Sequence, residues 1–184
     1  MPYVGQTITE VFPTSISVDT ATIATANISN QLTDANMSAG SVLQVVQGGR
    51  TTRVTHNSQT LTDVGVSATI TPSSTSSKIL VRLEAIVSNS NAGNITLVQL
   101  LRGDTPIGSG TGATGYNVLT ASIFGQNYSA TGASQSFLDS PATTSEITYK
   151  IRIAAFNGTG CLGGRGDSAV LATPTRLTLM EIAG

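Results

Sequence analysis

The stretch "SATITPSSTSSKILVRLEAIVS", residues 67–88, decides the fold. Pro72 and the hydroxyl-bearing residues 73–77 separate two runs in which apolar and polar residues alternate. In the second run one face carries only apolar residues, namely Ile79, Val81, Leu83, Ala85 and Val87. Because successive side chains of a β-strand point to opposite faces, this alternation predicts strands with one face on a core and one face in water.

A second block of the same kind occurs at "LDSPATTSEITYKIRIAAF", residues 138–156. Proline lacks an N–H group and restricts the residue before it, so Pro72 and Pro141 should each end a strand. The hydroxyls that follow can satisfy the backbone groups of a turn without adding bulk. We therefore expect both blocks to be corners where the chain crosses from one sheet to the other.

The remaining sequence from Ser41 onward has the same texture. Short apolar or alternating runs are separated by Gly, Pro and Asn, at 41–47, 64–70, 79–87, 94–103, 116–126, 135–139, 146–154, 167–172 and 176–183. The first run is expected to close at Gly48-Gly49, and residues 104–115, "DTPIGSGTGATG", are expected to be a loop. Eight or nine short strands at this spacing predict an all-β fold, an antiparallel, jelly-roll-like β-sandwich over residues 41–184 with almost no helix.

Residues 1–40 differ from the rest of the chain. Their apolar residues stand singly among Thr, Ser, Asn and Ala, so neither a helical stripe nor a strand pattern persists. A disordered tail is one interpretation. The recurrence of large apolar residues favours the other, an extended arm that lies on another protein. Its candidate contact residues are Tyr3, Val4, Phe12, Ile16, Ile23 and Ile28.

The composition restricts the partners that the chain can recruit by charge. Charged residues make up 10% of the 184 residues, against about 25% in an average soluble domain. With a net charge of −1 the chain should not attract nucleic acid or acidic lipid. No run approaches the ~20 apolar residues that span a bilayer, and the first ten residues do not form a secretory signal. We therefore expect a soluble product made in the cytoplasm, without membrane insertion.

No catalytic, metal or cofactor site is expected. His56 is the only histidine, and Ser168 in "GRGDSAVL" lacks the flanking glycines of a serine-protease nucleophile. The acidic residues are scattered, and the single cysteine, Cys161, excludes an intrachain disulfide. The glycine-rich segment "GSGTGATG" has neither the lysine nor the helix of a phosphate-binding loop. The sequence therefore predicts a protein that is not an enzyme.

Three further motifs suggest a function, but each also has an ordinary explanation, either chance occurrence or packing in the core. Arg165-Gly166-Asp167 spells an integrin-binding tripeptide, which is common by chance in glycine-rich loops. Five Asn-X-Ser/Thr sequons are unremarkable in a chain this rich in Asn, Ser and Thr. Candidate aromatic platforms for a sugar are Tyr116, Phe124 and Tyr128, for which packing in the core is the favoured interpretation. A secreted lectin or adhesin stays as an alternative class of protein.

Several of these segments resemble virion proteins of tailed bacteriophages. The chain is similar to the C-terminal β-sandwich modules of tail fibres and tailspikes and to trimeric capsid decoration (cement) proteins. The segments that carry the resemblance are "GSVLQVVQ" (40–47), "VGVSATITPSSTSSKILVRL" (64–83), "LLRGDTPIG" (100–108), "FLDSPATTSEITYKIRI" (137–153) and "LTLMEIAG" (177–184), with "ANISNQLTDANMSAG" upstream.

The resemblance implies a β-sandwich that assembles as a homotrimer on the outer surface of a virion. A fibre needs a shaft, and residues 1–40 suit an arm that clamps onto capsid subunits, so a decoration protein is favoured over a short tail fibre or tailspike tip. The implied partners are copies of the chain itself and the major capsid protein or other virion subunits. The glycine-rich loops at 103–117, 125–136 and 157–167 are expected to contact host-surface glycans weakly.

Overall fold

The computed structural model describes residues 37–110, 116, 118–123, 126–165 and 172–184. The chain divides into two units, Met1–Leu32 and Thr33–Gly184, and every described residue belongs to the second. Its strands are β1 (Val42–Arg50), β2 (Val54–His56), β3 (Thr62–Ile70), β4 (Lys78–Asn89), β5 (Ile95–Arg102), β6 (Thr105–Ile107), β7 (Thr120–Ile123), β8 (Ala130–Asp139), β9 (Ile147–Ala155), β10 (Gly160–Leu162) and β11 (Thr175–Ile182).

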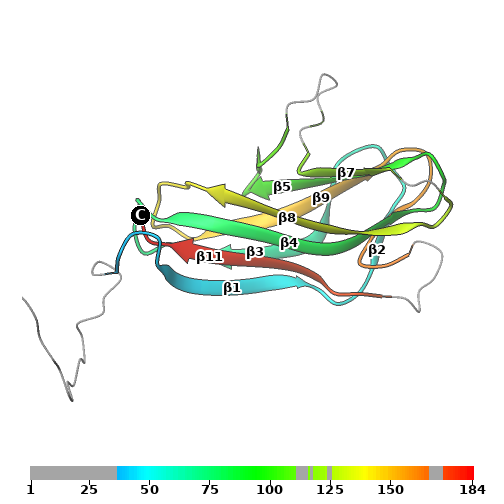
Figure 1. Ribbon diagram of the computed structural model, residues 1–184. Coiled ribbons are helices and arrows are strands. Elements are labelled where there is room, and N and C mark those ends of the chain that lie inside the picture. The colour runs from blue at the N-terminus through cyan, green and yellow to red at the C-terminus, as the bar shows by residue number, and fades with distance from the viewer. Residues whose placement is uncertain (1–36, 111–115, 117, 124–125, 166–171) are drawn as a thin grey trace, which may run out of the picture. The chain divides into compact units, whose positions relative to one another are not determined.

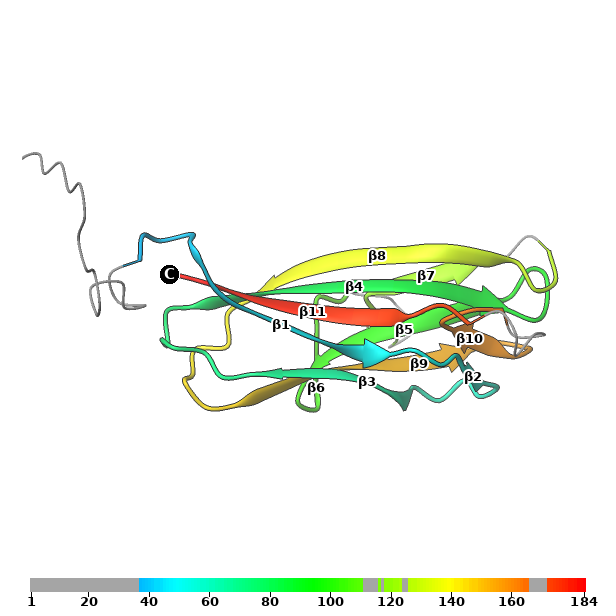
Figure 2. The same cartoon turned by 90° about the horizontal axis from the view of Figure 1, so that it is seen from below.

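The strands form two antiparallel sheets (Figures 1 and 2). In the six-stranded sheet the order is β1-β11-β4-β10-β2, and β8 pairs with the other edge of β4. In the five-stranded sheet the order is β3-β9-β5-β6, and β7 also pairs with β5. No strand pair among the described residues is parallel, and none of these residues is helical. The predicted all-β antiparallel sandwich is confirmed.

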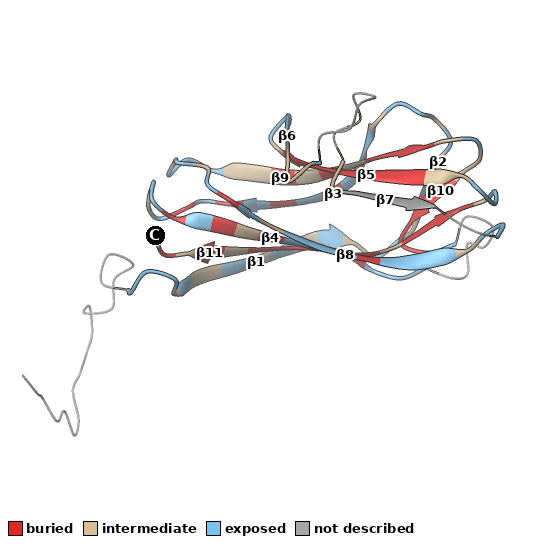
Figure 3. Ribbon diagram, turned by 45° about the horizontal axis from the view of Figure 1, so that its top comes forward, coloured by how far each residue is buried: buried red, intermediate tan, exposed pale blue. Residues whose placement is uncertain are grey.

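The core lies between the two sheets, where the buried segments of both layers face each other (Figure 3). The alternating run of β4 contributes one complete face to it: Ile79, Val81, Leu83 and Val87 are almost inaccessible, and Ala85 is buried. From β9 the residues Tyr149, Ile151 and Ile153 are fully buried, as their alternation predicts. Each apolar side chain removed from water in this way stabilises the fold by about 1.5–3 kcal/mol.

Both Pro-containing blocks are corners between the sheets, as predicted. The block after Pro72 joins β3 of the five-stranded sheet to β4 of the six-stranded sheet. The block around Pro141 joins β8 of the six-stranded sheet to β9 of the other. Both corners lie at the end of the sandwich that holds the C-terminus (Figure 1). We call this end the corner end.

One side of the sandwich is closed by β1 lying against β3. Side chains of β1 donate hydrogen bonds to main-chain carbonyls beside or within β3: Gln44 Nε2 to Thr71 O and Arg50 Nη1 to Val64 O, each at 2.8 Å. A Cβ on Gly48 would lie 2.0 Å from the carbonyl oxygen of Ser67, so only glycine permits this approach. The prediction that the strand closes at Gly48-Gly49 was therefore wrong, because β1 continues through both glycines to Arg50.

The described residues form eleven strands, more than the eight or nine predicted, because four are only three or four residues long. One of these, β6, lies inside the predicted loop 104–115 and pairs with the end of β5. Another, β2, carries His56, which was predicted in a polar loop. In contrast β8 extends over Ala130–Asp139, so most of the predicted loop 125–136 is strand. Of the predicted strand 167–172 only Ala172 is described, in an isolated bridge to Gly164.

Candidate assembly surface

A buried carboxylate holds the first corner. Glu181 in β11 is fully buried, and its Oε1 accepts hydrogen bonds from the backbone N and the Oγ of Ser73, both at 2.7 Å. Its Oε2 accepts a hydrogen bond of 2.6 Å from Gln44 Nε2. Burial raises the pKa of the Glu181 carboxyl, but the hydrogen bonds from Gln44 and Ser73, together with the nearby hydroxyl of Ser77, outweigh it and hold the pKa below its usual 4.5. The hydroxyls before β4 therefore solvate an ionised side chain from a strand 108 residues away.

Acid should weaken this corner. Because the folded pKa of Glu181 lies below the unfolded value, its ionisation stabilises the fold above the unfolded pKa, and this contribution is lost as the pH falls through the folded pKa. We expect Glu181→Gln, which leaves an amide facing the donors of Gln44 and Ser73, to cost about 1–3 kcal/mol at neutral pH and less in acid. Urea unfolding of both proteins from about pH 7 to about pH 3 measures this. If the difference in unfolding free energy between the two proteins stayed constant over that pH range, the proposed role of the Glu181 charge would be contradicted.

A second buried carboxylate holds the other corner. Asp139, at the end of β8, accepts a hydrogen bond of 2.7 Å from the hydroxyl of Tyr149. Nη1 of Arg102 lies 3.0 Å from both carboxylate oxygens of Asp139 and forms an ion pair with it. Burial, together with the hydrogen bond to Asp139, raises the pKa of Tyr149 far above its ordinary value. The cluster joins β5, β8 and β9 and ties the two sheets together at this corner.

The outer face of the six-stranded sheet carries apolar side chains at the corner end. One row crosses four strands in register: Val45 of β1 lies opposite Met180 of β11, Met180 opposite Leu80 of β4, and Leu80 opposite Leu138 of β8. A second row pairs Val42 with Ile182. We call these six residues the assembly face: Val42, Val45, Leu80, Leu138, Met180 and Ile182.

The side chains of the assembly face are exposed to solvent, and polar residues border them on the same face of the sheet. Exposure reaches 57% for Val45, 50% for Val42 and 48% for Leu138, and the other three residues are partly exposed. Four large hydrophobic residues are exposed in the described part of the chain, and Val42, Val45 and Leu138 are three of them. The neighbouring row across the same four strands is Gln47, Thr178, Arg82 and Ser136. A contiguous apolar patch with a polar rim is typical of a surface that contacts another protein.

Comparison with solved structures finds chains from virus particles. A chain of infectious bursal disease virus derived T=1 particles is matched over 100% of this chain and 41% of that chain, at 11% identity and a TM-score of 0.44. A chain of the infectious bursal disease virus Gt strain is matched over 80% and 39%, at 13% identity and a TM-score of 0.43. The chain thus spans about two fifths of the length of these viral chains. TM-scores this low carry no argument about the role of the present chain.

Comparison of the sequence gives no relative. No protein-family model matches the chain, and no curated protein sequence matches it.

Of the two residues considered for catalysis, only His56 is described. His56 Nε2 lies 3.0 Å from the carbonyl oxygen of Thr60 in its own turn, while Ser168 lies outside the described residues. Cys161 is fully buried, and burial raises the pKa of its thiol. Within the described ranges no three His, Cys, Asp or Glu side chains gather where they could hold a metal ion. These ranges also contain no helix that could span a membrane.

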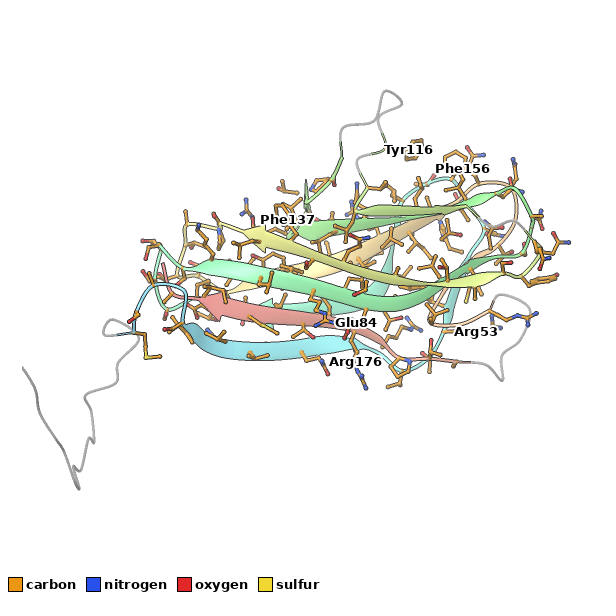
Figure 4. All side chains as sticks on the ribbon, viewed as in Figure 1. Arg53, Glu84, Tyr116, Phe137, Phe156 and Arg176 are labelled. Atoms are coloured by element: carbon orange, nitrogen blue, oxygen red, sulfur yellow. The ribbon has the colours of Figure 1, made fainter. Side chains whose placement is uncertain are left out.

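Of the Arg165-Gly166-Asp167 tripeptide, only Arg165 is described. Asn94, Asn127 and Asn157 of the five sequons are described. Tyr116 packs edge-to-face on Phe156, with 5.3 Å between the ring centroids (Figure 4). Phe124 and the arm residues Tyr3, Val4, Phe12, Ile16, Ile23 and Ile28 lie outside the described residues. The interpretation of residues 1–40 as an arm stays a prediction.

Two of the predicted loops, 125–136 and 157–167, are each hydrogen-bonded to the end of β4 and the residue after it, at the end of the sandwich opposite the corners. There Tyr128 N donates a hydrogen bond of 3.1 Å to Asn89 O, and Ser90 N donates one of 2.9 Å to Thr159 O. Tyr128 is 38% exposed and has a φ of 57°, which is unusual for an aromatic residue. The third predicted loop begins at the corner end instead, where Gly103 N donates to Thr148 O. The structure therefore gathers only part of the predicted glycan-contacting loops at one end.

Proposed function

We propose that the protein is a structural component of a virus particle that assembles as a homotrimer through the assembly face. The observation that supports self-association is the apolar row Val45, Met180, Leu80 and Leu138, which burial against another copy would remove from water. The number of three copies follows from the resemblance to trimeric decoration proteins. A chain with 10% charged residues has few ion pairs to offer, so association should depend on apolar contact. The resemblance of the two corner blocks to phage virion proteins supports the particle assignment.

The role proposed within the particle is decoration of the capsid. Three sandwiches on one axis would present three N-terminal segments to neighbouring capsid subunits, and multivalent attachment strengthens contacts that are individually weak. Such binding stabilises the assembled shell, because a ligand that binds only the assembled state shifts the equilibrium towards it. The role requires no catalysis. Weak contact of the Tyr128 end with host glycans is a further element of the proposal.

The second candidate is the tip of a short tail fibre or tailspike, which the same sequence segments resemble. Immunogold labelling of intact particles with an antibody against the protein distinguishes the two roles. Gold over the whole head is expected for a decoration protein, and gold restricted to the tail would contradict it. Removal of residues 2–39 should leave a trimer that no longer binds capsids; capsid binding by this variant would exclude the arm as the attachment element.

A further inference from the structure

A second feature of the corner end is a cavity of about 220 Å³ beside the assembly face. Four serines, the residues 73, 74, 76 and 77, line it together with Met37, Leu43, Ala183 and Gly184. Leu43 and Ala183 directly follow Val42 and Ile182 of the assembly face in the sequence. The cavity therefore has hydroxyls on one part of its wall and aliphatic groups on another, and it lies at the strand ends that carry Val42 and Ile182 of the assembly face.

The cavity contains an unpartnered polar group. Ser77 is 2% exposed, and its Oγ is the buried side-chain polar atom without a hydrogen bond in the described part of the protein. Leaving a hydroxyl in this state costs about 1–3 kcal/mol, so its retention points to a hydrogen-bonding group that fills the cavity in the functional state.

The charge of Glu181 defines which group is suited to the cavity. Ser73 and Ser77 both line the cavity and both lie against the Glu181 carboxylate, on which Ser73 makes two hydrogen bonds. All three groups that lower the pKa of this carboxylate are neutral, and no cation is among the causes of the shift. An uncompensated buried negative charge favours a positively charged donor nearby.

The ammonium group of Lys78 forms no ion pair with a carboxylate of the described residues. It is exposed and lies opposite Ile182 on the outer face, whereas Ser77, the residue before it, turns inward to the cavity. The same strand start therefore presents an ammonium on one side and a cavity suited to an ammonium on the other. Met37 and Leu43 offer aliphatic surface for the methylenes of a lysine side chain.

We propose that Lys78 of one copy inserts its ammonium group into the serine-lined cavity of the next copy, an inference that rests on the trimer proposed above. Each copy gives a lysine to one neighbour and receives a lysine from the other. Such a contact is heterologous, because it joins two different surfaces of neighbouring copies. Repeated around a threefold axis, it forms a closed ring of three chains. The apolar face supplies the affinity, and the lysine contact fixes the rotation between neighbouring copies.

The test is a double-mutant cycle on the concentration at which the trimer dissociates, measured by sedimentation of the full-length protein. Lys78→Gln and Ser77→Ala should each raise this concentration at least about tenfold, and the double variant should lose little more than either single variant. Ser77→Ala should at the same time leave the unfolding free energy of the dissociated chain close to that of the wild type, because the Ser77 hydroxyl makes no hydrogen bond in the free chain. Lys150→Gln makes the same charge change at the exposed pair with Asp104 and should have no effect.

A disulfide experiment locates the contact. In a mixture of Lys78→Cys and Ser74→Cys chains, disulfides should form between the two kinds of chain. Additive losses in the cycle, or an unaffected trimer in Lys78→Gln, would overturn the lysine contact and leave the proposed trimer intact. A crystal structure of the trimer with only ordered water on Ser77 would overturn it in the same way. A wild-type chain that is monomeric at micromolar concentration would overturn both proposals.

Discussion

Val45→Lys should convert the proposed trimer into monomers. Val45 lies at the β1 end of the apolar row with 57% of its surface exposed, so a lysine there is solvated in the free chain and should not disturb the fold. In the proposed trimer each of the three copies would bury one such lysine. Its ammonium group would be removed from water next to Met180 and Leu80, with no carboxylate in the same row. Burial of an unpaired charge costs several kcal/mol. Light scattering should therefore change from three times the 18.8 kDa chain mass to one.

Gln47→Lys is the matched control, because Gln47 lies two residues further along β1 on the same face, in the polar row. It introduces the same charge and should leave the trimer mass unchanged if the interface is limited to the apolar rows. The unfolding midpoints of both variants should match that of the wild type when all are compared as monomers. A trimeric Val45→Lys protein with a normal fold would refute the assembly face as the site of self-association.

Asp139→Ala should be the most destabilising single substitution at the corners. It leaves the fully buried hydroxyl of Tyr149 without its partner and leaves Arg102 without its carboxylate. Removing one member of a buried ion pair costs about 3–5 kcal/mol, and the partial exposure of Arg102 places the expected loss near the lower value. Urea unfolding at neutral pH measures the change, provided that the slope of the transition stays constant.

Glu84→Gln provides the comparison for an exposed ion pair. Glu84 lies 2.8 Å from Arg82, and both side chains are about half exposed, so its substitution should cost less than about 1 kcal/mol. Tyr149→Phe removes one hydrogen bond and keeps the Arg102–Asp139 pair, so its loss should fall between the two. Equal losses for Asp139→Ala and Glu84→Gln would show that the Asp139 cluster does not hold its corner.

The sequence predicted those parts of the fold that depend on local pattern. The alternation in β4 and β9 placed the correct residues in the core, and the two prolines marked the crossings between sheets. The very short strands were missed because three residues are too few for a period to be recognised. Gly48 and Gly49 were taken for a strand end because the close approach of β1 to β3 is a tertiary contact.

The candidate site was harder to predict because it depends on register. Val45, Met180 and Leu138 are single apolar residues in three separate strands, and each alone is an ordinary surface residue. Only the pairing of β1 with β11, β11 with β4, and β4 with β8 places them in one row. Glu181 and Asp139 likewise appeared scattered, since their partners lie far away in the sequence or on another sheet. The hydroxyl-rich residues 73–77 were predicted to form a turn, and their role around a carboxylate was not recognised.

The position of β11 has a consequence for biosynthesis. This strand is the last in the sequence, yet it lies between β1 and β4 and is paired along both edges. While the ribosome is still translating earlier codons, the facing edges of β1 and β4 have no middle strand to join them, and the contacts of Glu181 cannot form. A nascent chain in which β11 has not yet emerged therefore cannot complete its larger sheet, and it exposes unpaired strand edges for that time. A product truncated before Thr175 would lack β11 and could not close this sheet.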